Sequence, residues 1–397
     1  MERAELARTL GFAWRGDQAG PHWVEAEDPR RFMADFGAAV AAGGNVFLCD
    51  PAWKASEREL ARALSEAASP EGGGWLMVPS GGSGGRVKFA RHDGTTIQAA
   101  VDGFRRHFRM ERVHAVSVLP LHHVSGLMAW MRCALTGGSL LPWSWKEAQA
   151  GRFPDGAPSG SCLSLVPTQL QRLLSRPESV DWLRSFAVIF VGGGPSWESL
   201  LGEAERLGLP LSLGYGATET AAMVAALTPE QFLKGERGCG RALPHARIEL
   251  VDGLVRIRAE SLYLGYHPNT RNDPWWDTGD MGSLDASGNL TILGRSDDVL
   301  ITGGKKVSPA EVESALRASG QFEDVVVVGL QDPEWGQMVV ACHPRGTSAP
   351  LRERVESSLE GLAPYKHPKR YVELSPWPRN AQGKVSRSEL ARLAAAR

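Results

Sequence analysis

Short apolar runs alternate with helical patterns over the first two-thirds of the chain, and this alternation limits the possible folds more than any other feature. Four such pairs lie at residues 45–50 with 56–68, 115–121 with 125–138, 161–167 with 168–175, and 186–194 with 196–208. Strands that alternate with helices form a mainly parallel sheet with helices on its faces. Ligands of such a sheet bind at the loops that leave the carboxyl ends of its strands, so we expect functional residues there.

The pattern changes near residue 245. Residues 246–261 are typical of a β-hairpin with its turn at Asp252-Gly253, and residues 282–295 are typical of a second hairpin with Gly288 at the turn. Two hairpins without intervening helical patterns predict a small β subdomain.

A helix with a capping box is predicted next, because Ser308, Pro309 and Glu311 fit its N-cap, N1 and N3 positions. Two strand-like runs and another helical pattern follow. The sequence therefore predicts an α/β protein. Its large N-terminal domain, residues 1–294, has mainly parallel sheets covered by helices plus the small β subdomain. A small α+β lid domain, residues 295–397, follows.

The composition is that of a globular protein without a general attraction to polyanions. Of 397 residues, 43% are hydrophobic and 22% are charged, which is ordinary for globular chains. The 44 basic and 45 acidic side chains give a net charge of −1, so we expect neither nucleic acid nor an anionic membrane as a partner. No apolar stretch approaches the roughly 20 residues that a membrane-spanning helix needs.

The cysteines and the N-terminal residues indicate the cellular compartment of the protein. The five cysteines lie far apart without a C-x-x-C pair, so we interpret them as reduced thiols rather than disulfides or a zinc site. The N-terminal sequence MERAELARTLGF has acidic residues and no apolar signal core. Both observations predict a cytoplasmic protein.

The stretch VPSGGSGGRVKFA (78–90) is a glycine-rich loop with cations at its exit. It fits a phosphate cradle, but it also contains G-x-S-x-G around Ser83, the signature of a nucleophilic serine. A nucleophile elbow needs a helix after the serine, whereas here Val87 and Phe89 alternate with Lys88 in an extended pattern. Bare backbone N–H groups and a lysine can wrap a triphosphate, so we favour the cradle over the elbow and over a plain glycine hairpin.

The stretch LGYGATETAAM (213–223) leaves a predicted strand and carries Tyr215, Thr218 and Glu219. A carboxylate beside a polyphosphate is a natural magnesium ligand. Alone, the Thr-Glu-Thr sequence fits equally well a helix N-terminus with an acidic first turn.

Two later motifs bring further polar groups. Asp280 lies in a tight Thr-Gly-Asp turn, where a fixed carboxylate can accept both hydroxyls of a ribose, and Arg295 could reach the same ribose or a phosphate. The alternatives are a turn aspartate and a surface arginine. Lys384 lies on a Gly-Lys loop just before a helix that Ser386 and Glu389 are predicted to cap, although a lysine near a C-terminus is usually a solvated side chain.

The stretch LPLHHVSG (119–126) places His122 and His123 after another predicted strand. No other histidine lies at a metal-binding spacing from them, so a metal site is not predicted. One of them could gate a pocket, and a histidine satisfied within the core is the alternative.

The order of these motifs resembles the acyl-adenylate-forming ligases, the superfamily of acyl-CoA synthetases, firefly luciferase and peptide-synthetase adenylation domains. The resemblance covers roughly residues 75–390 and rests on the Gly/Ser loop, P-L-x-H-V-S-G, V-P-T, G-G-G-P, Y-G-x-T-E-T, T-G-D, G-R-x-D-D, G-G-x-K-V-x-P-x-E-V-E and G-K-V-x-R. The stretches SGGSGGRVKFARHDGTT, LPLHHVSGLMAWMR, LSLVPTQLQRLL and GCGRALPHARIEL are most similar to the short cyanobacterial and plant-type 2-succinylbenzoate–CoA ligases.

The resemblance implies an enzyme with ATP, Mg²⁺ and coenzyme A that joins 2-succinylbenzoate to CoA through an acyl-AMP, in menaquinone or phylloquinone synthesis. It implies catalytic roles for Lys384, Thr218, Glu219 and His123, with Glu219 on the metal. It implies nucleotide binding by Ser80, Gly81, Gly82, Ser83, Gly84, Gly85, Lys88, Tyr215, Gly216, Asp280 and Arg295. It implies acid binding by His123, Thr168, Gly192, Gly193, Gly194 and Gly214, and a hinge at Asp297.

The chain departs from the family pattern in two places. Gly81 and Gly84 replace hydroxyl residues of the usual phosphate loop, and the region before the loop is shorter than in most of the superfamily. The cation for the second carboxylate of 2-succinylbenzoate stays open among Arg132, Arg172 and Lys88. Other readings also stay open: another carboxylic acid, an acyl-AMP ligase that serves a carrier protein, a silent nucleotide-binding relative, and assembly as a homodimer.

Overall fold

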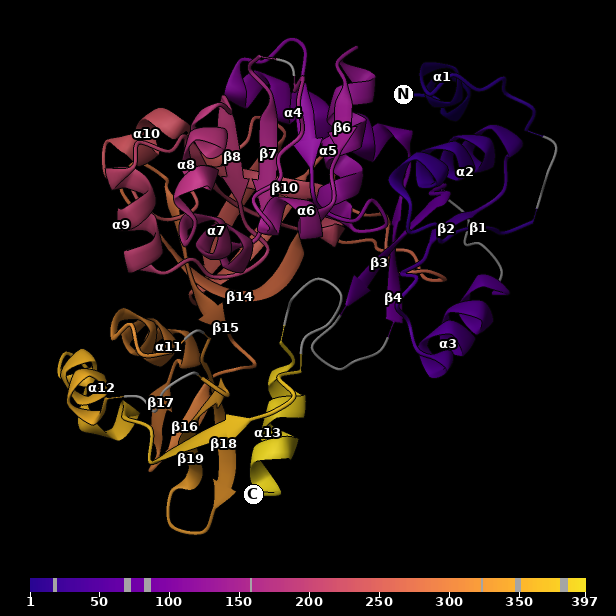
Figure 1. Cartoon of the computed structure of the whole chain (residues 1–397). Helices are drawn as coiled ribbons and strands as arrows, with labels where there is room; N and C mark the ends of the chain where they lie inside the picture. Colours follow the sequence, from indigo (N-terminus) through magenta and orange to yellow (C-terminus); the bar gives the residue numbers. More distant parts are fainter. Residues whose placement is uncertain are drawn as a thin grey trace.

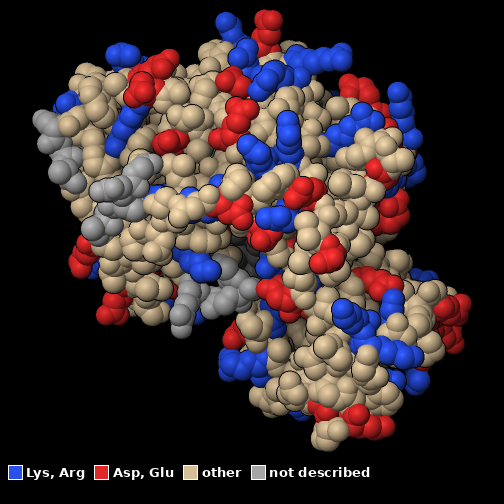
Figure 2. All heavy atoms as spheres, turned by 180° about the vertical axis from the view of Figure 1, so that it is seen from behind, with Lys and Arg blue, Asp and Glu red and all other residues tan. Residues whose placement is uncertain are grey.

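The computed structural model describes residues 1–16, 20–67, 73–81, 87–157, 159–322, 324–346, 351–378 and 385–397. The chain forms a large lobe, in which three β-sheets lie, and a smaller C-terminal lobe beside it (Figure 1). Seen from behind, basic and acidic side chains are interspersed over both lobes, in keeping with the net charge of −1 (Figure 2).

The first sheet holds the glycine-rich hairpin at its edge. Its strands are β1 (His22–Val24), β2 (Val46–Leu48), β3 (Leu76–Gly81) and β4 (Val87–His92), in that spatial order, with the first three parallel and β4 antiparallel to β3. The helices of this region are α1 (Arg3–Thr9), α2 (Pro29–Ala42) and α3 (Ala55–Ser65). The predicted strand–loop–strand arrangement at residues 78–90 is therefore confirmed at both described strands, which excludes the helix that a nucleophile elbow needs.

The second sheet is the predicted parallel sheet. Its order is β11-β10-β9-β8-β7-β5-β6, and the five strands from β9 to β6 are parallel. The strands are β5 (Ala115–Ser117), β6 (Leu140–Pro142), β7 (Cys162–Leu165), β8 (Val188–Val191), β9 (Leu211–Ala217), β10 (Ala222–Ala226) and β11 (Arg241–Ala242). The accompanying helices are α4 (Gly94–Phe108), α5 (Val124–Leu135), α6 (Trp145–Gln149), α7 (Pro167–Leu174), α8 (Pro177–Arg184), α9 (Glu198–Arg206) and α10 (Pro229–Leu233), with a 3-10 turn η1 (Thr218–Thr220).

Helices α4 and α5 lie between these two sheets. Their apolar side chains pack on one side against strands of the first sheet and α2. On the other side, Phe104 of α4 and Cys133 of α5 pack against β5, β7 and β8. Helices α7, α8 and α9 cover the opposite face of the second sheet through a separate cluster of buried leucines. This layered burial on both faces explains why the parallel strands are short, continuous apolar runs.

The third sheet is the predicted β subdomain. It contains β12 (Ala246–Val251), β13 (Leu254–Ala259), β14 (Trp276–Leu284) and β15 (Leu290–Arg295), all antiparallel. Both hairpin turns are confirmed, since Asp252, Gly253 and Gly288 all have positive φ angles.

The small lobe is built on the fourth sheet, with β16 (Leu300–Thr302), β17 (Lys305–Val307), β18 (Val326–Asp332), β19 (Gly336–Pro344) and β20 (Arg370–Leu374). Helices α11 (Pro309–Ala318) and α12 (Arg352–Leu359) pack on one face and α13 (Arg387–Ala395) on the other, with a short turn η2 (Pro364–Lys366) before β20 (Figure 1). The boundary predicted at residues 294–295 falls at the end of β15 and stays a prediction.

The two predicted helix caps differ in outcome. Ser386 caps α13 as predicted, because its side chain accepts a hydrogen bond from the backbone N–H of Glu389. The capping box at α11 is wrong in its chemistry although Ser308 and Pro309 do occupy the N-cap and N1 positions. The Ser308 hydroxyl instead donates to the Leu293 carbonyl at 3.3 Å, and the Glu311 carboxylate binds Lys366. A tertiary partner has replaced the local one in both cases.

The described cysteines are all free thiols, as the spacing predicted. Within the part of the chain that the structure describes, no helix is long and apolar enough to cross a membrane.

Candidate active site

The predicted acid-binding residues gather at the carboxyl edge of the second sheet. His123 follows β5, Thr168 follows β7, Gly192–Gly194 follow β8, and Gly214 lies in the middle of β9. These four strands are parallel neighbours, so the loops that leave them meet at one edge. Gly192 and Gly214 lie close together, because a Cβ built on Gly192 would be 3.1 Å from the Gly214 carbonyl oxygen.

Glu219 is the carboxylate at which three distant segments meet. Its side chain is buried, with only 5% of the residue exposed, and its Oε1 accepts hydrogen bonds from Ser80 Oγ and Tyr266 Oη, both at 2.6 Å. No residue among those described donates to its other oxygen, Oε2. One face of the carboxylate is thus held by hydroxyls from the hairpin and from residues 261–267, and the other is left for a cation.

The hairpin reaches Glu219 through its own strand pairing. Ser80 and Lys88 lie directly opposite each other in the β3–β4 ladder, and the Lys88 ammonium lies 5.2 Å from the centre of the Tyr266 ring. Tyr266 itself is tied to β4 by a bridge with Ala90. Gly81 ends β3 as an exposed residue, while Gly82, Ser83, Gly84 and Gly85 lie outside the described residues.

The 3-10 turn that carries Thr218 and Glu219 is fixed by buried contacts. His92 Nε2 lies 2.8 Å from the Thr218 carbonyl oxygen, and burial lowers the pKa of His92, so the ring is neutral and donates to this carbonyl. Just before the turn, a Cβ on Gly216 would lie 1.8 Å from the Ala222 carbonyl oxygen, so only glycine fits there. The Thr-Glu-Thr sequence thus forms one 3-10 turn rather than the start of an α-helix.

A second polar cluster joins Tyr215, Asp280, Arg295 and Asp297. The Tyr215 hydroxyl donates to Asp280 Oδ2 at 2.5 Å, and Arg295 Nη1 lies 3.4 Å from Asp280 Oδ1. Arg295 also binds Asp297, with Nε 3.0 Å from Oδ1 and Nη2 3.2 Å from Oδ2. Burial raises the pKa of Asp280, and hydrogen bonds from Tyr215 and Arg295 oppose that rise. The predicted hinge residue is therefore linked to the predicted ribose carboxylate through one guanidinium.

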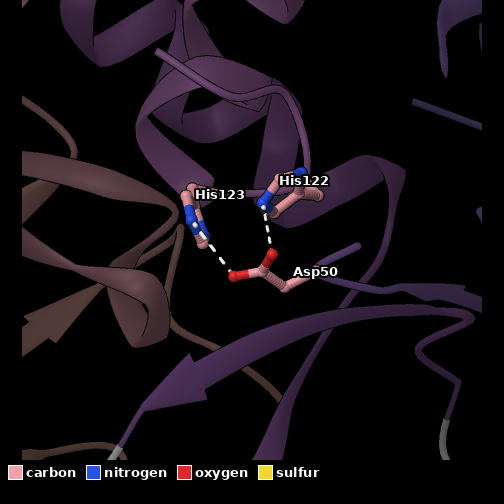
Figure 3. Close-up of side chains that lie close together, drawn as sticks. All are labelled: Asp50, His122 and His123. Atoms are coloured by element: carbon pink, nitrogen blue, oxygen red, sulfur yellow. Dashed lines mark ion pairs between the residues drawn. The ribbon is translucent and has the colours of Figure 1, made fainter. Parts of the chain in front are cut away.

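The histidine pair lies against a buried carboxylate (Figure 3). His122 Nε2 is 3.5 Å from Asp50 Oδ1, and His123 Nε2 is 3.9 Å from Asp50 Oδ2. His123 is the N-cap residue of α5, and Asp50 follows β2 of the first sheet. One ligand atom from each residue lies within 4.8 Å of the others, which is a set that could hold a metal ion. Asp50 lies more than 70 residues before the histidines in the chain, so their sequence spacing does not indicate this carboxylate.

Other predicted residues lie apart from these clusters or outside the described ranges. Lys384 is outside the described residues. Arg132 lies nine residues along α5 from His123, a rise of about 13 Å, and is buried among aromatic residues. Its position argues against contact with an acid bound near His123. Arg172 lies one turn after Thr168 on α7 and is half-buried.

Sequence reasoning missed Tyr266, His92 and Asp50. Tyr266 and Glu219 are 47 residues apart, and Ser80 and Glu219 are 139 apart, so no local spacing could predict their contact. The available signal was weak: a tyrosine directly after the hairpin pattern at residues 246–261, and an aspartate directly after the apolar run VFLC.

Taken together, the two clusters can bind a polyanion and its counter-ion. A hairpin with a lysine faces a buried carboxylate whose Oε2 has no donor among the described residues, and a second carboxylate lies beside an arginine. Such a site can hold phosphates, a divalent cation and vicinal hydroxyls.

Comparison with known proteins gives two family matches. The AMP-binding enzyme family matches residues 75–258, and the AMP-binding enzyme C-terminal domain matches residues 311–384. An indoleacetate–CoA ligase of Aromatoleum aromaticum is 33% identical over 348 residues, covering 81% of this chain and 67% of that protein. A 2-succinylbenzoate–CoA ligase of Bacillus licheniformis is 30% identical over 336 residues, covering 79% and 69%.

Among solved structures, the o-succinylbenzoate CoA synthetase of Bacillus subtilis, in complex with its acyl-adenylate intermediate, superposes with a TM-score of 0.76. The match covers 98% of this chain and 91% of that one at 22% identity, which establishes the likeness of fold. The glycine-rich hairpin at residues 78–90 lies within the region that matches the AMP-binding enzyme family.

Proposed function

Because the chain belongs to the AMP-binding enzyme family, we propose that it is an AMP-forming acid–CoA ligase whose acid is 2-succinylbenzoate. The observation that carries the chemistry is the meeting of Ser80, Glu219 and Tyr266. It places the glycine-rich hairpin directly against a buried carboxylate at the carboxyl edge of the parallel sheet. Relatives that act on this acid, at about 30% identity, support the choice of substrate.

In the first half-reaction the acid carboxylate attacks the α-phosphate of ATP, which gives acyl-AMP and releases pyrophosphate. Two anions must approach each other, so neutralising charge is the main task of the protein. Ser80, Lys88 and the backbone of the hairpin bind the β- and γ-phosphates, and Thr218 binds the α-phosphate. Glu219 would hold Mg²⁺, and that ion would offset phosphate charge. The free Oε2 and the two hydroxyl bonds on Oε1 fit this role.

The second cluster binds the nucleoside. Asp280 accepts the ribose hydroxyls and Arg295 supports it, while Tyr215 and Gly216 lie beside the adenine. The hydroxyl of Tyr215 is held by Asp280, which fixes the ring at the end of β9. Lys384 bridges the reacting carboxylate and the ribose side, as the family resemblance implies, and aligns the attack.

In the second half-reaction the CoA thiol attacks the acyl-AMP and displaces AMP. The small lobe turns about Asp297 to remove Lys384, and the loop between β16 and β17 then faces the acyl group. That loop can turn sharply because Gly303 and Gly304 both have positive φ angles. His123, Thr168 and the glycines after β8 line the acid pocket.

The choice of acid has one alternative with specific support. The relative with 33% identity acts on indoleacetate, which carries a single carboxylate. 2-Succinylbenzoate carries a second carboxylate that needs a cation in the pocket, and the position of Arg132 leaves Arg172 and Lys88 as candidates. We further propose a cytoplasmic location, which fits the free thiols, and a homodimer as the assembly to be tested by light scattering.

The test is acid-dependent exchange of labelled pyrophosphate into ATP, which reports adenylate formation alone. With 2-succinylbenzoate the exchange should be fast in the wild-type protein and lost in Glu219→Gln. Exchange with indoleacetate instead would keep the chemistry and overturn the substrate. If none of the acids on a panel of aromatic and aliphatic carboxylates supported exchange, the proposed function would be overturned.

A further inference from the structure

A cavity of 550 Å³ opens beside the third sheet, and none of its lining residues is assigned to the proposed reaction. It is lined by the segment before β12, by the end of β13 and by residues 271–274, including His245, Arg247, Arg258, Glu260 and Arg271. Cavities of this size commonly hold small molecules. The lining carries three arginines against one glutamate, so its charge favours an anion.

The two arginines at the mouth face each other without a counter-ion. Arg247 and Arg258 are direct cross-strand partners in the β12–β13 ladder. Like charges in this position are destabilising, because their Cβ atoms lie only about 5 Å apart. Neither guanidinium forms an ion pair or a side-chain hydrogen bond with any residue in the described ranges. On β13, by contrast, Arg256 forms ion pairs with Glu249 and Asp277.

Arg271 is already partly positioned. It donates to the carbonyl oxygens of Tyr263 and Trp275, and its guanidinium lies 5.4 Å from the centre of the Tyr263 ring. These neutral contacts fix the side chain. The negative charge of Asp273 acts on Arg271, but no carboxylate of the described residues lies within ion-pair distance of it. The carboxylate of Glu260, the acid on the lining, lies beyond ion-pair distance of all three arginines.

The inner end of the cavity holds a buried imidazole with unused polar atoms. His245 is 3% exposed, and neither ring nitrogen has a hydrogen-bond partner in the described part of the chain. The ring packs against α4, since a Cβ on Gly103 would lie 1.8 Å from His245 Nδ1. A buried polar group without a partner is unfavourable, so its presence at a cavity indicates a ligand atom or water.

Another cation without an ion pair in the described ranges lies near this histidine. Arg132 is 5% exposed, has no ion pair or side-chain hydrogen bond among the described residues, and lies over the ring of Phe104 at 4.2 Å. Phe104 is the neighbour of Gly103 on α4. Arg132 and Arg106 both act to lower the pKa of His245, which places their charges near the ring. A buried guanidinium without an anion is costly to maintain.

We propose that this cavity is an anion site that binds a small phosphate-bearing ligand, with Arg247, Arg258 and Arg271 on the phosphate and His245 at its inner end. Guanidinium groups match phosphate oxygens with paired N–H donors, which two facing arginines on adjacent strands can supply together. The site is separate from the Glu219 and Asp280 clusters and is additional to the proposed ligase activity.

The test is protection of arginines from phenylglyoxal, mapped by mass spectrometry on the whole protein. Inorganic phosphate should slow the labelling of Arg247 and Arg258 in a saturable way and leave Arg206, an exposed arginine on α9, unchanged. Pyrophosphate and CoA are tested in separate arms. The compound that protects the arginines at the lowest concentration identifies the source of the phosphate. Sodium chloride at equal ionic strength controls for screening.

A binding titration with inorganic phosphate provides the second measurement. The double variant R247Q/R258Q should bind it about tenfold or more weakly, whereas the matched variant Arg206→Gln should bind as the wild type does. All three substituted positions are exposed, so the proteins should fold. The proposal is overturned if phosphate protects Arg206 equally, if sodium chloride protects as well as phosphate, or if the double variant binds phosphate unchanged.

Discussion

Replacing Tyr266 by phenylalanine removes a single hydroxyl from the proposed magnesium site. That hydroxyl donates to Glu219 Oε1 at 2.6 Å, and burial together with the nearby Glu219 carboxylate raises the pKa of Tyr266 well above its usual range. The hydroxyl therefore stays protonated and donates throughout the working pH range. Its loss leaves Ser80 as the remaining hydroxyl donor to a carboxylate that is 5% exposed.

The size of the effect follows from the type of bond. A hydrogen bond to a charged group contributes about 1.5–3 kcal/mol, which corresponds to a factor of about 10–150 in an equilibrium or rate constant. Ser80 is expected to turn toward the phosphates when ATP binds, so Tyr266 would then be the main group that orients Glu219. We expect Tyr266→Phe to lower the rate of adenylate formation by about 10- to 100-fold at limiting Mg²⁺.

The assay is acid-dependent pyrophosphate exchange, measured across a range of Mg²⁺ concentrations. The variant should need more Mg²⁺ for half-maximal rate, and saturating Mg²⁺ should recover part of the loss. Tyr371→Phe on β20, where the ring is 42% exposed, is the control for replacing a tyrosine. If Tyr266→Phe showed wild-type rates at limiting Mg²⁺, the role given to the Ser80–Glu219–Tyr266 contact would be refuted.

The remaining predictions concern stability and the two half-reactions. Burial and neighbouring arginines lower the pKa of His245 to about 4, below the unfolded value of about 6.5, so the unfolded chain gains a proton first as pH falls. Stability should fall below pH 6.5, by about 2 kcal/mol at pH 5, and urea titrations should show a smaller fall for His245→Gln. An equal fall in both proteins would contradict the assignment. Arg387→Ala removes the nearer of the two arginines that pair with Glu313, whose side chain is 1% exposed and which then keeps Arg317 at 3.8 Å. The variant should destabilise the small lobe by about 3 kcal/mol in denaturant, with partial recovery in the double variant that also carries Glu313→Gln. A loss under about 1 kcal/mol would show that the pair is not effectively buried. Lys384→Ala should abolish adenylate formation but spare thiolysis of supplied acyl-AMP, and an equal loss of both would disprove its proposed role.

The sequence predicted the architecture because the fold is dominated by buried parallel strands. Strands such as β7 and β8 are continuous apolar runs, and the helices after them begin at residues that the pattern marks clearly. The hairpin turns at Asp252-Gly253 and Gly288 were readable because they require positive φ angles, which few residues adopt. The sequence pattern predicted an element correctly where its residues interact with their near neighbours in the chain.

Local rules failed where a distant partner replaced a local one. The Ser308 hydroxyl bonds a carbonyl of β15 instead of its own helix, and Glu311 binds Lys366 of the η2 turn. The same reason kept Tyr266 and Asp50 from being recognised. Tyr266 reaches Glu219 only because residues 264–267 pair with β4, and Asp50 reaches the histidines only because the first sheet lies against α5.

The candidate site also has a part that the sequence predicts and a part that only the structure shows. The order of the motifs identified Thr218, Glu219, Asp280 and Arg295 as candidate site residues. In the structure Glu219 contacts Ser80, and Asp280 contacts Arg295. The roles of these residues remain proposals. Lys384 and most of the glycine-rich loop lie outside the described residues, so their roles rest on the family resemblance.

The measurement that tests the central proposal most directly is formation of a CoA thioester with ATP and Mg²⁺, detected by mass spectrometry across 2-succinylbenzoate, indoleacetate, benzoate, coumarate and medium-chain fatty acids. We predict a strong and selective signal for 2-succinylbenzoyl-CoA, with AMP released in equal amount. A thioester formed only with another acid would contradict the substrate, adenylate without thioester would indicate transfer to a carrier protein, and the absence of both products with every acid would contradict the ligase itself.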